Sequence, residues 1–157
     1  MHSRIFQVSE KPITEFTDEY RYEEGFVGSH ADYVVGVEYD SEDYVSDLKW
    51  LQNVAEGIEV NLKEKTITVT NKKQYFSEKH DKFQELLEKL QNITLEEFSS
   101  VNTYFDIFNL KSAYEDEYSF YIDDNDESCG IATLDNWVRN AEEGKKYYVG
   151  SIFDYHF

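Results

Sequence analysis

Apolar and polar residues alternate with a period of two in residues 58–70 (IEVNLKEKTITVT). The apolar side chains of this stretch point one way and its charged and threonine side chains point the other. We therefore expect a hairpin that turns near residues 63–65 and packs one face on a core. Short runs rich in β-branched and aromatic residues predict the other strands, which are residues 3–9, 33–37, 117–123, 129–133 and 145–157.

A helical period is clearest in residues 41–57 (SEDYVSDLKWLQNVAEG). Ser41 is a suitable amino-terminal cap, and Gly57 suits the left-handed conformation beyond the carboxyl end. The apolar residues of this segment are spaced to form one stripe, made of Tyr44, Leu48, Leu51 and Ala55. We expect one amphipathic helix here.

Three more segments have helical features. Residues 77–91 place apolar residues on one side and mixed lysine and glutamate on the other. Thr94 with Glu97 has the pattern of a capping box that opens a further helical stretch, although the sequence after it also tolerates a strand. Residues 133–144 predict a short helix. The apolar residues that continue the stretch after the capping box at helical spacing are Phe98, Val101, Phe105 and Phe108.

This order of elements predicts an α+β fold with a mainly antiparallel sheet and three or four helices. The length of 157 residues suits a single compact domain spanning 1–157, and 7 Gly with 1 Pro mark no linker. Hydrophobic residues make up 40% of the chain and aromatic residues 17%, which excludes the composition of a disordered protein.

The net charge of −18 indicates which partners the protein can bind rather than how it folds. It is unevenly placed, because residues 1–57 carry −9, residues 58–93 carry +1 and residues 94–157 carry −10. Such a field repels nucleic acid and anionic membranes and speeds encounter with basic partners. We therefore expect no direct binding to nucleic acid or membrane. An acidic surface that serves solubility alone is the competing interpretation.

Cysteine content and apolar run length bear on location. The single Cys129 has no partner for an internal disulfide, and no run approaches the ~20 apolar residues of a membrane helix. The first residues, MHSRIFQVSEK, contain no secretory apolar core. These features predict a cytoplasmic protein.

Acidic residues interleaved with tyrosine are the main candidate for a functional surface. Tyrosine supplies rigid contact area with a polar tip, and carboxylates pair with Arg or Lys of a partner. We predict a non-enzymatic binding protein for a basic partner, which is either a nucleic-acid-binding protein whose cleft this chain occupies or a basic toxin. The predicted partner-binding residues are Glu38, Asp40, Glu42, Asp43, Asp47, Glu115, Asp116, Glu117, Asp123, Asp124 and Asp126.

A metal-dependent enzyme is the alternative of another class. The heptads VGSHADY (27–33) and VGSIFDY (149–155) agree at five positions, which we interpret as local structure or chance rather than duplication. If they lie side by side, four side chains converge on a divalent metal. These candidates are His30, Asp32, Asp154 and His156.

Other chemistry has little support in the sequence. Residues 123–128 resemble a calcium loop only in part, because Cys129 stands where that loop needs glycine. No phosphate-binding glycine loop or nucleophile elbow occurs, and we expect no cofactor. A third interpretation is an acidic structural domain that self-associates through a neutral face such as residues 58–93, so the oligomeric state stays open.

Overall fold

The computed structural model describes residues 1–125 and 130–157, which form seven strands, five α-helices and one short 3-10 helix, η1 (Glu19–Tyr22). The strands are β1 (His2–Ser9), β2 (Tyr33–Val37), β3 (Ile58–Asn61), β4 (Thr66–Val69), β5 (Tyr121–Asp124), β6 (Ile131–Thr133) and β7 (Lys146–His156). The helices are α1 (Glu42–Val54), α2 (Lys72–Gln91), α3 (Leu95–Phe98), α4 (Asn102–Tyr114) and α5 (Leu134–Asn140). The predicted α+β class is confirmed.

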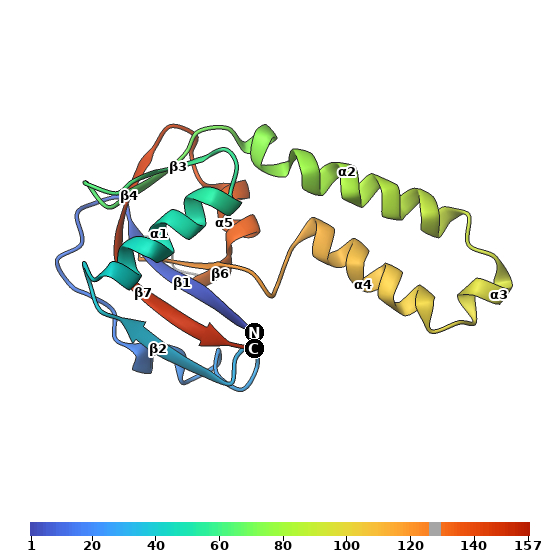
Figure 1. The fold of residues 1–157 in the computed structure, drawn as a ribbon, viewed down its shortest axis with the longest axis horizontal. Coiled ribbons are helices and arrows are strands. Elements are labelled where there is room, and N and C mark those ends of the chain that lie inside the picture. Colours follow the sequence, from blue (N-terminus) through green and yellow to red (C-terminus); the bar gives the residue numbers. More distant parts are fainter. Residues whose placement is uncertain (126–129) are drawn as a thin grey trace.

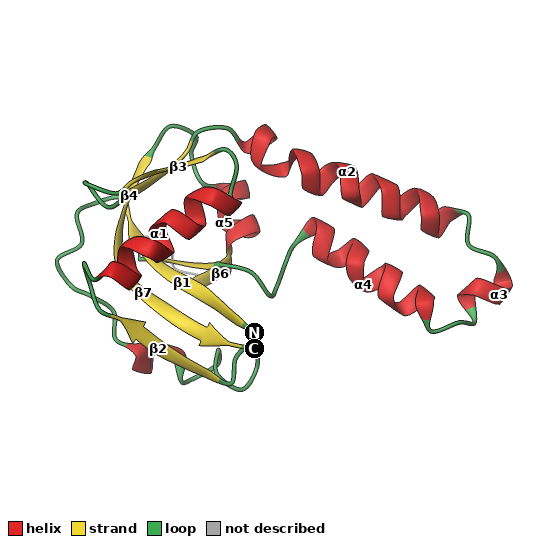
Figure 2. Ribbon diagram, in the orientation of Figure 1, coloured by secondary structure: helices red, strands yellow, loops and turns green. Residues whose placement is uncertain are grey.

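One curled sheet has the long strand β7 near its middle (Figures 1 and 2). The strand order is β3-β4-β7-β1-β5-β6, and β2 pairs with β7 beyond the end of β4. All pairs are antiparallel except β1 with β5. β7 is therefore the element against which both the β3–β4 hairpin and β2 are registered.

Both faces of the sheet are covered, because successive strand residues point to opposite sides. On the first face, α1 and α5 pack on a large core; the sheet residues there include Phe6, Val8, Ile67, Ile122, Val149 and Ile152. On the second face, the segment around η1 packs on a smaller core; its members are Ile5, Tyr22, Phe26, Ala31, Tyr121, Phe153 and Tyr155. Tyr44, Leu48, Leu51 and Ala55, the predicted stripe of α1, are all buried.

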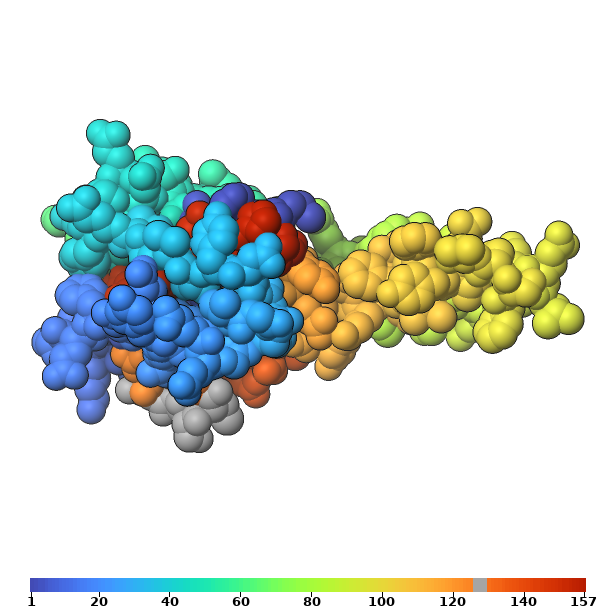
Figure 3. Space-filling model, turned by 90° about the horizontal axis from the view of Figure 1, so that it is seen from below, coloured from blue at the N-terminus to red at the C-terminus, as the bar shows by residue number. Residues whose placement is uncertain are grey.

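Helices α2, α3 and α4 form a hairpin that projects from the sheet and its covering layers (Figures 1 and 3). We call residues 72–114 the arm and the rest of the described chain the body. Only Tyr75, Leu86 and Thr103 of α2 and α4 are buried. None of the helices in residues 1–125 and 130–157 combines the length and apolar composition that a bilayer crossing needs.

The arm also contains the main differences from the predicted helices. α2 begins at Lys72, five residues before the predicted start, because the Asn71 side chain accepts a hydrogen bond from the Gln74 amide (3.0 Å) and caps it. The predicted capping box is present: the Thr94 hydroxyl accepts from the Glu97 amide and the Glu97 carboxylate accepts from the Thr94 amide. The helix that it opens is interrupted after Phe98, which gives five α-helices rather than three or four.

The two similar heptads are not a structural repeat. Residues 27–32 form a turn in which Gly28 has a φ of +85°, whereas residues 149–155 lie within the extended strand β7. β2 begins at Tyr33, the last residue of the first heptad, and pairs with the end of β7, with Tyr33 opposite His156. The interpretation as local structure is therefore the better one.

Gly57 provides a prediction about stability. It has a φ of +76°, and an added Cβ would lie 2.2 Å from the Asn71 carbonyl oxygen, a backbone atom. We expect Gly57→Ala to lower the free energy of unfolding by more than about 2 kcal/mol, from left-handed strain plus this clash. Urea denaturation checks this value. Gly144→Ala is the control, because Gly144 also has a positive φ but open space around the Cβ position; an equal loss in both variants would refute the clash.

Candidate functional site

Residues 14–43 are a strongly acidic segment of the body, and we call them the N-terminal acidic face. They contain ten acidic residues and one basic residue, Arg21. Arg21 is already paired, since its Nε lies 2.9 Å from the buried carboxylate of Asp123. Figure 3 shows this segment, in blue to cyan, spread over one side of the body. The face therefore presents carboxylates with little compensating charge of its own.

A buried glutamine fixes the first part of this face to the sheet. Gln7, on β1, is 1% exposed. Its side-chain oxygen accepts from the amides of Ser151 (2.8 Å) and Thr17 (3.3 Å), and its side-chain nitrogen donates to the Glu15 carbonyl (3.3 Å). Ser151 adds a hydrogen bond from its hydroxyl to the Thr17 carbonyl (2.9 Å). The acidic segment that follows Pro12 is thus held in place although it contains little regular structure.

The second part of the face is the start of α1. Ser41 caps this helix by accepting from the Tyr44 amide (3.1 Å), and Glu42 and Asp43 occupy the first turn, where the helix dipole stabilises negative charge. The rings of Phe16 and Tyr39 lie 4.7 Å apart and join the two parts of the face.

Exposed carboxylates and aromatic rings therefore alternate at this end of α1. Asp40 is paired with Lys65 (2.9 Å). Within residues 1–125 and 130–157, Glu38, Glu42 and Asp43 take part in no ion pair. These three carboxylates are the part of the predicted set that is available to a partner.

The second predicted acidic segment is occupied by the protein's own groups. Glu115 accepts a hydrogen bond from the Thr133 hydroxyl (2.7 Å), and Glu117 pairs with Lys111 (2.9 Å). The Asp116 carboxylate accepts from the Tyr118 amide (3.0 Å). All three residues are half-buried. They stabilise the junction between the arm and β5, so we leave them out of the partner surface.

Three further predicted partner residues, Asp47, Asp123 and Asp124, are buried. Asp123 accepts from the Tyr22 hydroxyl (2.7 Å) and holds η1 on the sheet, and Asp124 accepts from the Trp137 indole (3.1 Å). A carboxylate buried in this way fixes the fold and is not accessible to a partner. Asp126 lies outside the described residues.

Asp47 belongs to a charged network on the α1 face of the sheet. Arg4 lies between two carboxylates, with its Nε 2.8 Å from Asp47 and its Nη1 2.5 Å from Asp154. Its guanidinium also lies over the ring of Trp50, 5.4 Å from the centroid. Burial raises the pKa of Asp47, and the neighbouring Arg4 opposes that shift. The network fixes α1 to β1 and β7.

The predicted metal ligands come together only in part. Pairing of β2 with β7 brings His156 Nδ1 to 3.0 Å from Asp32 Oδ2, and Asp154 shares that face with His2, whose Nδ1 lies 3.1 Å away. His30 instead stacks on Phe26, which belongs to the core of the opposite face. Among the described residues, no group of three or more His, Cys, Asp or Glu side chains is placed to hold a metal ion. His30 lies in the turn before β2, and its ring packs on Phe26 and near Tyr121 on the second face of the sheet, away from Asp154 and His156.

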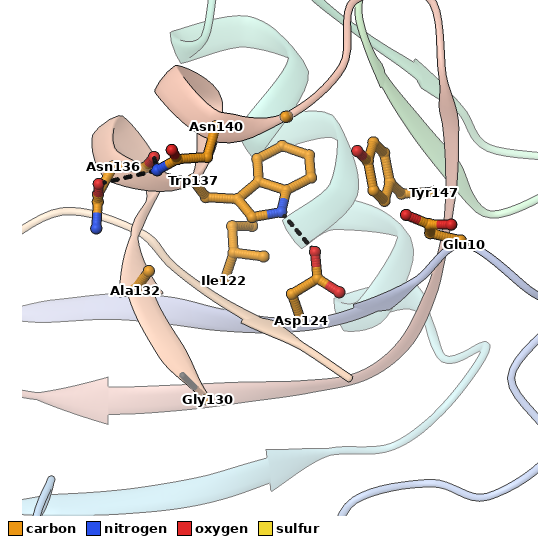
Figure 4. Close-up of a pocket in the computed structure, with 10 residues that line it drawn as sticks. Glu10, Ile122, Asp124, Gly130, Ala132, Asn136, Trp137, Asn140 and Tyr147 are labelled. Atoms are coloured by element: carbon orange, nitrogen blue, oxygen red, sulfur yellow. Dashed lines mark hydrogen bonds between the residues drawn. The ribbon is translucent and has the colours of Figure 1, made fainter. Parts of the chain in front are cut away.

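The sequence did not reveal a cavity of about 280 Å³ beside α5 (Figure 4). Trp137 and Tyr147 form its aromatic walls, with ring centroids 5.0 Å apart. Asn136 and Asn140, one helical turn apart on α5, line another side, and Asp124 lies at its base. The spacing of the two asparagines is the one sequence signal for this cavity.

Comparison with known proteins does not indicate what these surfaces bind. No family model, curated protein or solved structure matches the chain.

Proposed function

We propose that this protein is a non-enzymatic acidic binding protein that engages a basic protein through its N-terminal acidic face. The observation that carries the proposal is the end of α1, where Glu38, Glu42 and Asp43 are exposed beside the Phe16–Tyr39 ring pair. Carboxylates around exposed aromatic rings suit a partner that offers Arg or Lys around an apolar centre.

The charge distribution supports this choice of face. Residues 14–43 carry −9 on one side of the body, and their one basic residue is engaged by Asp123. A field of one sign steers an oppositely charged partner and raises its association rate, and salt screens that effect over about 8–10 Å. Binding through this face should therefore be fast and sensitive to salt.

Two kinds of basic partner fit the proposal. A DNA mimic occupies the basic cleft of a nucleic-acid-binding protein, so duplex DNA should release the partner in competition. An inhibitor of a basic toxin covers a surface that need not bind DNA, so duplex DNA at the same ionic strength should have no effect. The competition experiment separates these versions once a partner is in hand.

The test compares two variants with equal charge. Glu38→Gln/Glu42→Gln/Asp43→Asn removes three carboxylates from the face, and Glu59→Gln/Glu78→Gln/Asp81→Asn removes three exposed ones elsewhere, so both carry −15. The wild-type chain and each variant are immobilised, exposed to lysate of the native host at low salt and eluted with a salt gradient. We expect wild type and control to retain one basic protein in stoichiometric amount, and the face variant to bind it at least about tenfold more weakly.

Stability provides the internal check on that result. Glu42 and Asp43 each interact with the helix dipole by only about 0.3–1 kcal/mol, so the face variant should remain folded by circular dichroism. Equal retention of the same protein by all three chains would refute the assignment of the face. A diffuse set of basic proteins lost at physiological salt would show that the charge serves solubility.

A further inference from the structure

The arm carries a row of exposed apolar side chains along α3, the turn after it and α4. We call this row the apolar stripe; it consists of Leu95, Phe98, Val101, Tyr104, Phe105 and Phe108. Their exposed fractions run from 40% for Phe108 to 85% for Leu95. Single exposed apolar residues are ordinary on a protein surface, but a contiguous patch of this kind marks an interface.

The inner side of α4 shows that the stripe is not turned toward the rest of the chain. Thr103 is buried against the α3 turn and donates to the Glu97 carbonyl (2.6 Å), and Asp106 pairs with Lys89 of α2 (2.7 Å). Residues 104, 105 and 108 lie on the opposite side of the helix, at 100° per residue. Tyr118 packs beside the ring of Phe108 at 6.4 Å, and all six residues of the stripe remain exposed.

We infer that the stripe is the contact between two copies of this chain, with their arms antiparallel. Charge is the first argument for a second copy. The six side chains are uncharged, and the charged residues between Leu95 and Leu110 are Glu96, Glu97 and Asp106, of which Glu97 caps α3 and Asp106 pairs with Lys89. This leaves little charge along the stripe for a basic partner to recognise, whereas an identical apolar stripe is its complement.

The charge along the arm selects the antiparallel orientation. The base of the arm, residues 72–82 and 108–114, contains five basic and two acidic residues, and its outer part, residues 83–107, contains one basic and five acidic residues. In an antiparallel pair, each acidic outer part lies beside the basic base of the other copy. A parallel pair would place like charges together.

The same orientation separates the two bodies. The arm carries −1 and the remainder of the chain carries −17, so contact between bodies would be strongly repulsive. A 20-residue helix such as α2 is about 30 Å long. Bodies at opposite ends of paired arms are therefore separated by several Debye lengths of about 8 Å.

The area of the stripe is sufficient for a stable pair. Taking large side chains at about 150–250 Å² each, the exposed parts of the six residues amount to on the order of 700 Å² per copy. A standard interface buries about 800 Å² per partner. In a two-fold dimer, both copies contribute the same surface to the interface, so the stripe of each copy contacts the stripe of the other.

Sedimentation equilibrium of the purified chain tests this inference. We expect a mass of twice the 18.6 kDa chain at micromolar concentration. Phe105→Glu places a charge in the stripe and should raise the dissociation constant at least about thirtyfold, because central aromatic residues dominate interfaces. Phe16→Glu is the matched control: Phe16 is exposed to 50%, against 56% for Phe105, but it lies on the acidic face, so its dimer should be unchanged. Val101→Glu is the second stripe variant if Phe105→Glu fails to fold.

A charge exchange tests the orientation. Glu96→Lys and Lys111→Glu should each weaken the dimer several-fold, and the double variant should restore it, because the two positions face each other across an antiparallel pair. A monomeric wild type, or a dimer that Phe105→Glu leaves intact, overturns the inference. Absence of rescue overturns the antiparallel arrangement. The outcome is independent of the proposed function, since capture of a basic partner by Phe105→Glu should equal that of wild type.

Discussion

Raising the pH above about 10 should lower the free energy of unfolding of this protein steeply, because tyrosines in its core are buried with their phenols neutral. Burial raises the pKa of six buried tyrosines, and for Tyr121 it raises the pKa to about 12. The six are Tyr22, Tyr44, Tyr75, Tyr121, Tyr147 and Tyr155. Next to burial, the neighbouring carboxylates of Asp123 and Asp135 raise the pKa of Tyr22 and Tyr75.

The direction in which stability changes with pH follows from proton linkage. In the unfolded chain these phenols ionise near pH 10, whereas in the folded chain they keep their protons at higher pH. Stability is thus fully present below about pH 10 and falls as the pH rises toward the folded-state values. Each group contributes up to about 1.4 kcal/mol per pH unit, so the six together give up to about 8 kcal/mol per pH unit. The ion pairs of Lys145 and Lys146, whose pKa values are also raised, add to the loss in the same direction.

Urea denaturation from pH 8 to 11, with tyrosinate absorbance recorded in parallel, measures this effect. About six tyrosinates should appear together with the loss of secondary structure. Tyr121→Phe should reduce the pH slope by about one sixth, since it removes one of the six groups. Ionisation of all tyrosines in one gradual step with the secondary structure retained would show that these phenols are not buried as the structure places them.

The regular elements of the body could be predicted because their signals are local. Ser41 and Thr133 each cap a helix where an acceptor side chain precedes a helical period. The alternation in residues 58–70 places Ile58, Val60, Ile67 and Val69 on the core, as expected. These patterns indicate which residues share a face. For the body this is sufficient, because each apolar face packs on a core beside the sheet.

The exposure of the arm could not be predicted, because the spacing of apolar residues does not determine what covers them. Phe98, Val101, Phe105 and Phe108 have the spacing of a core-facing helix, yet all four are exposed. The self-association suggested by sequence placed the neutral contact at residues 58–93. In the structure, the exposed apolar side chains lie on α3 and α4, beyond that range.

The carboxylates were the least predictable part of the candidate site. Glu42 and Asp123 contribute equally to the acidic composition. Glu42, however, is exposed at a helix end, whereas Asp123 is 0% exposed beneath η1. The difference arises because β5 has covered faces on both sides, so Asp123 and Asp124 both point into the protein. Position in the sheet, rather than charge density along the chain, decides which acids can meet a partner.

Asp135→Ala should be the most damaging single substitution at the base of the arm. Asp135 is 3% exposed and accepts hydrogen bonds from the Tyr75 hydroxyl (2.8 Å), the Lys79 ammonium (3.1 Å) and the Asp116 amide (2.9 Å). These donors come from the start of α2 and from the segment after α4, so one carboxylate on α5 holds both ends of the arm. Its removal leaves the buried Tyr75 hydroxyl and the half-buried Asp116 amide without this acceptor.

We expect a loss of about 3–5 kcal/mol in the free energy of unfolding, the cost of removing one member of a buried charged network. Asp106→Ala, the same change within the arm, removes a single pair with the largely exposed Lys89 and should cost less, about 1 kcal/mol. Urea denaturation of both variants gives the comparison, and hydrogen exchange should show faster opening of the first turn of α2 in Asp135→Ala alone. Equal losses in the two variants would mean that the arm is held by other contacts, such as the stacking of Arg139 on Tyr114 (4.1 Å). An arm fixed by Asp135 presents its stripe in one orientation, so this carboxylate couples the stability of the body to the geometry of the proposed dimer.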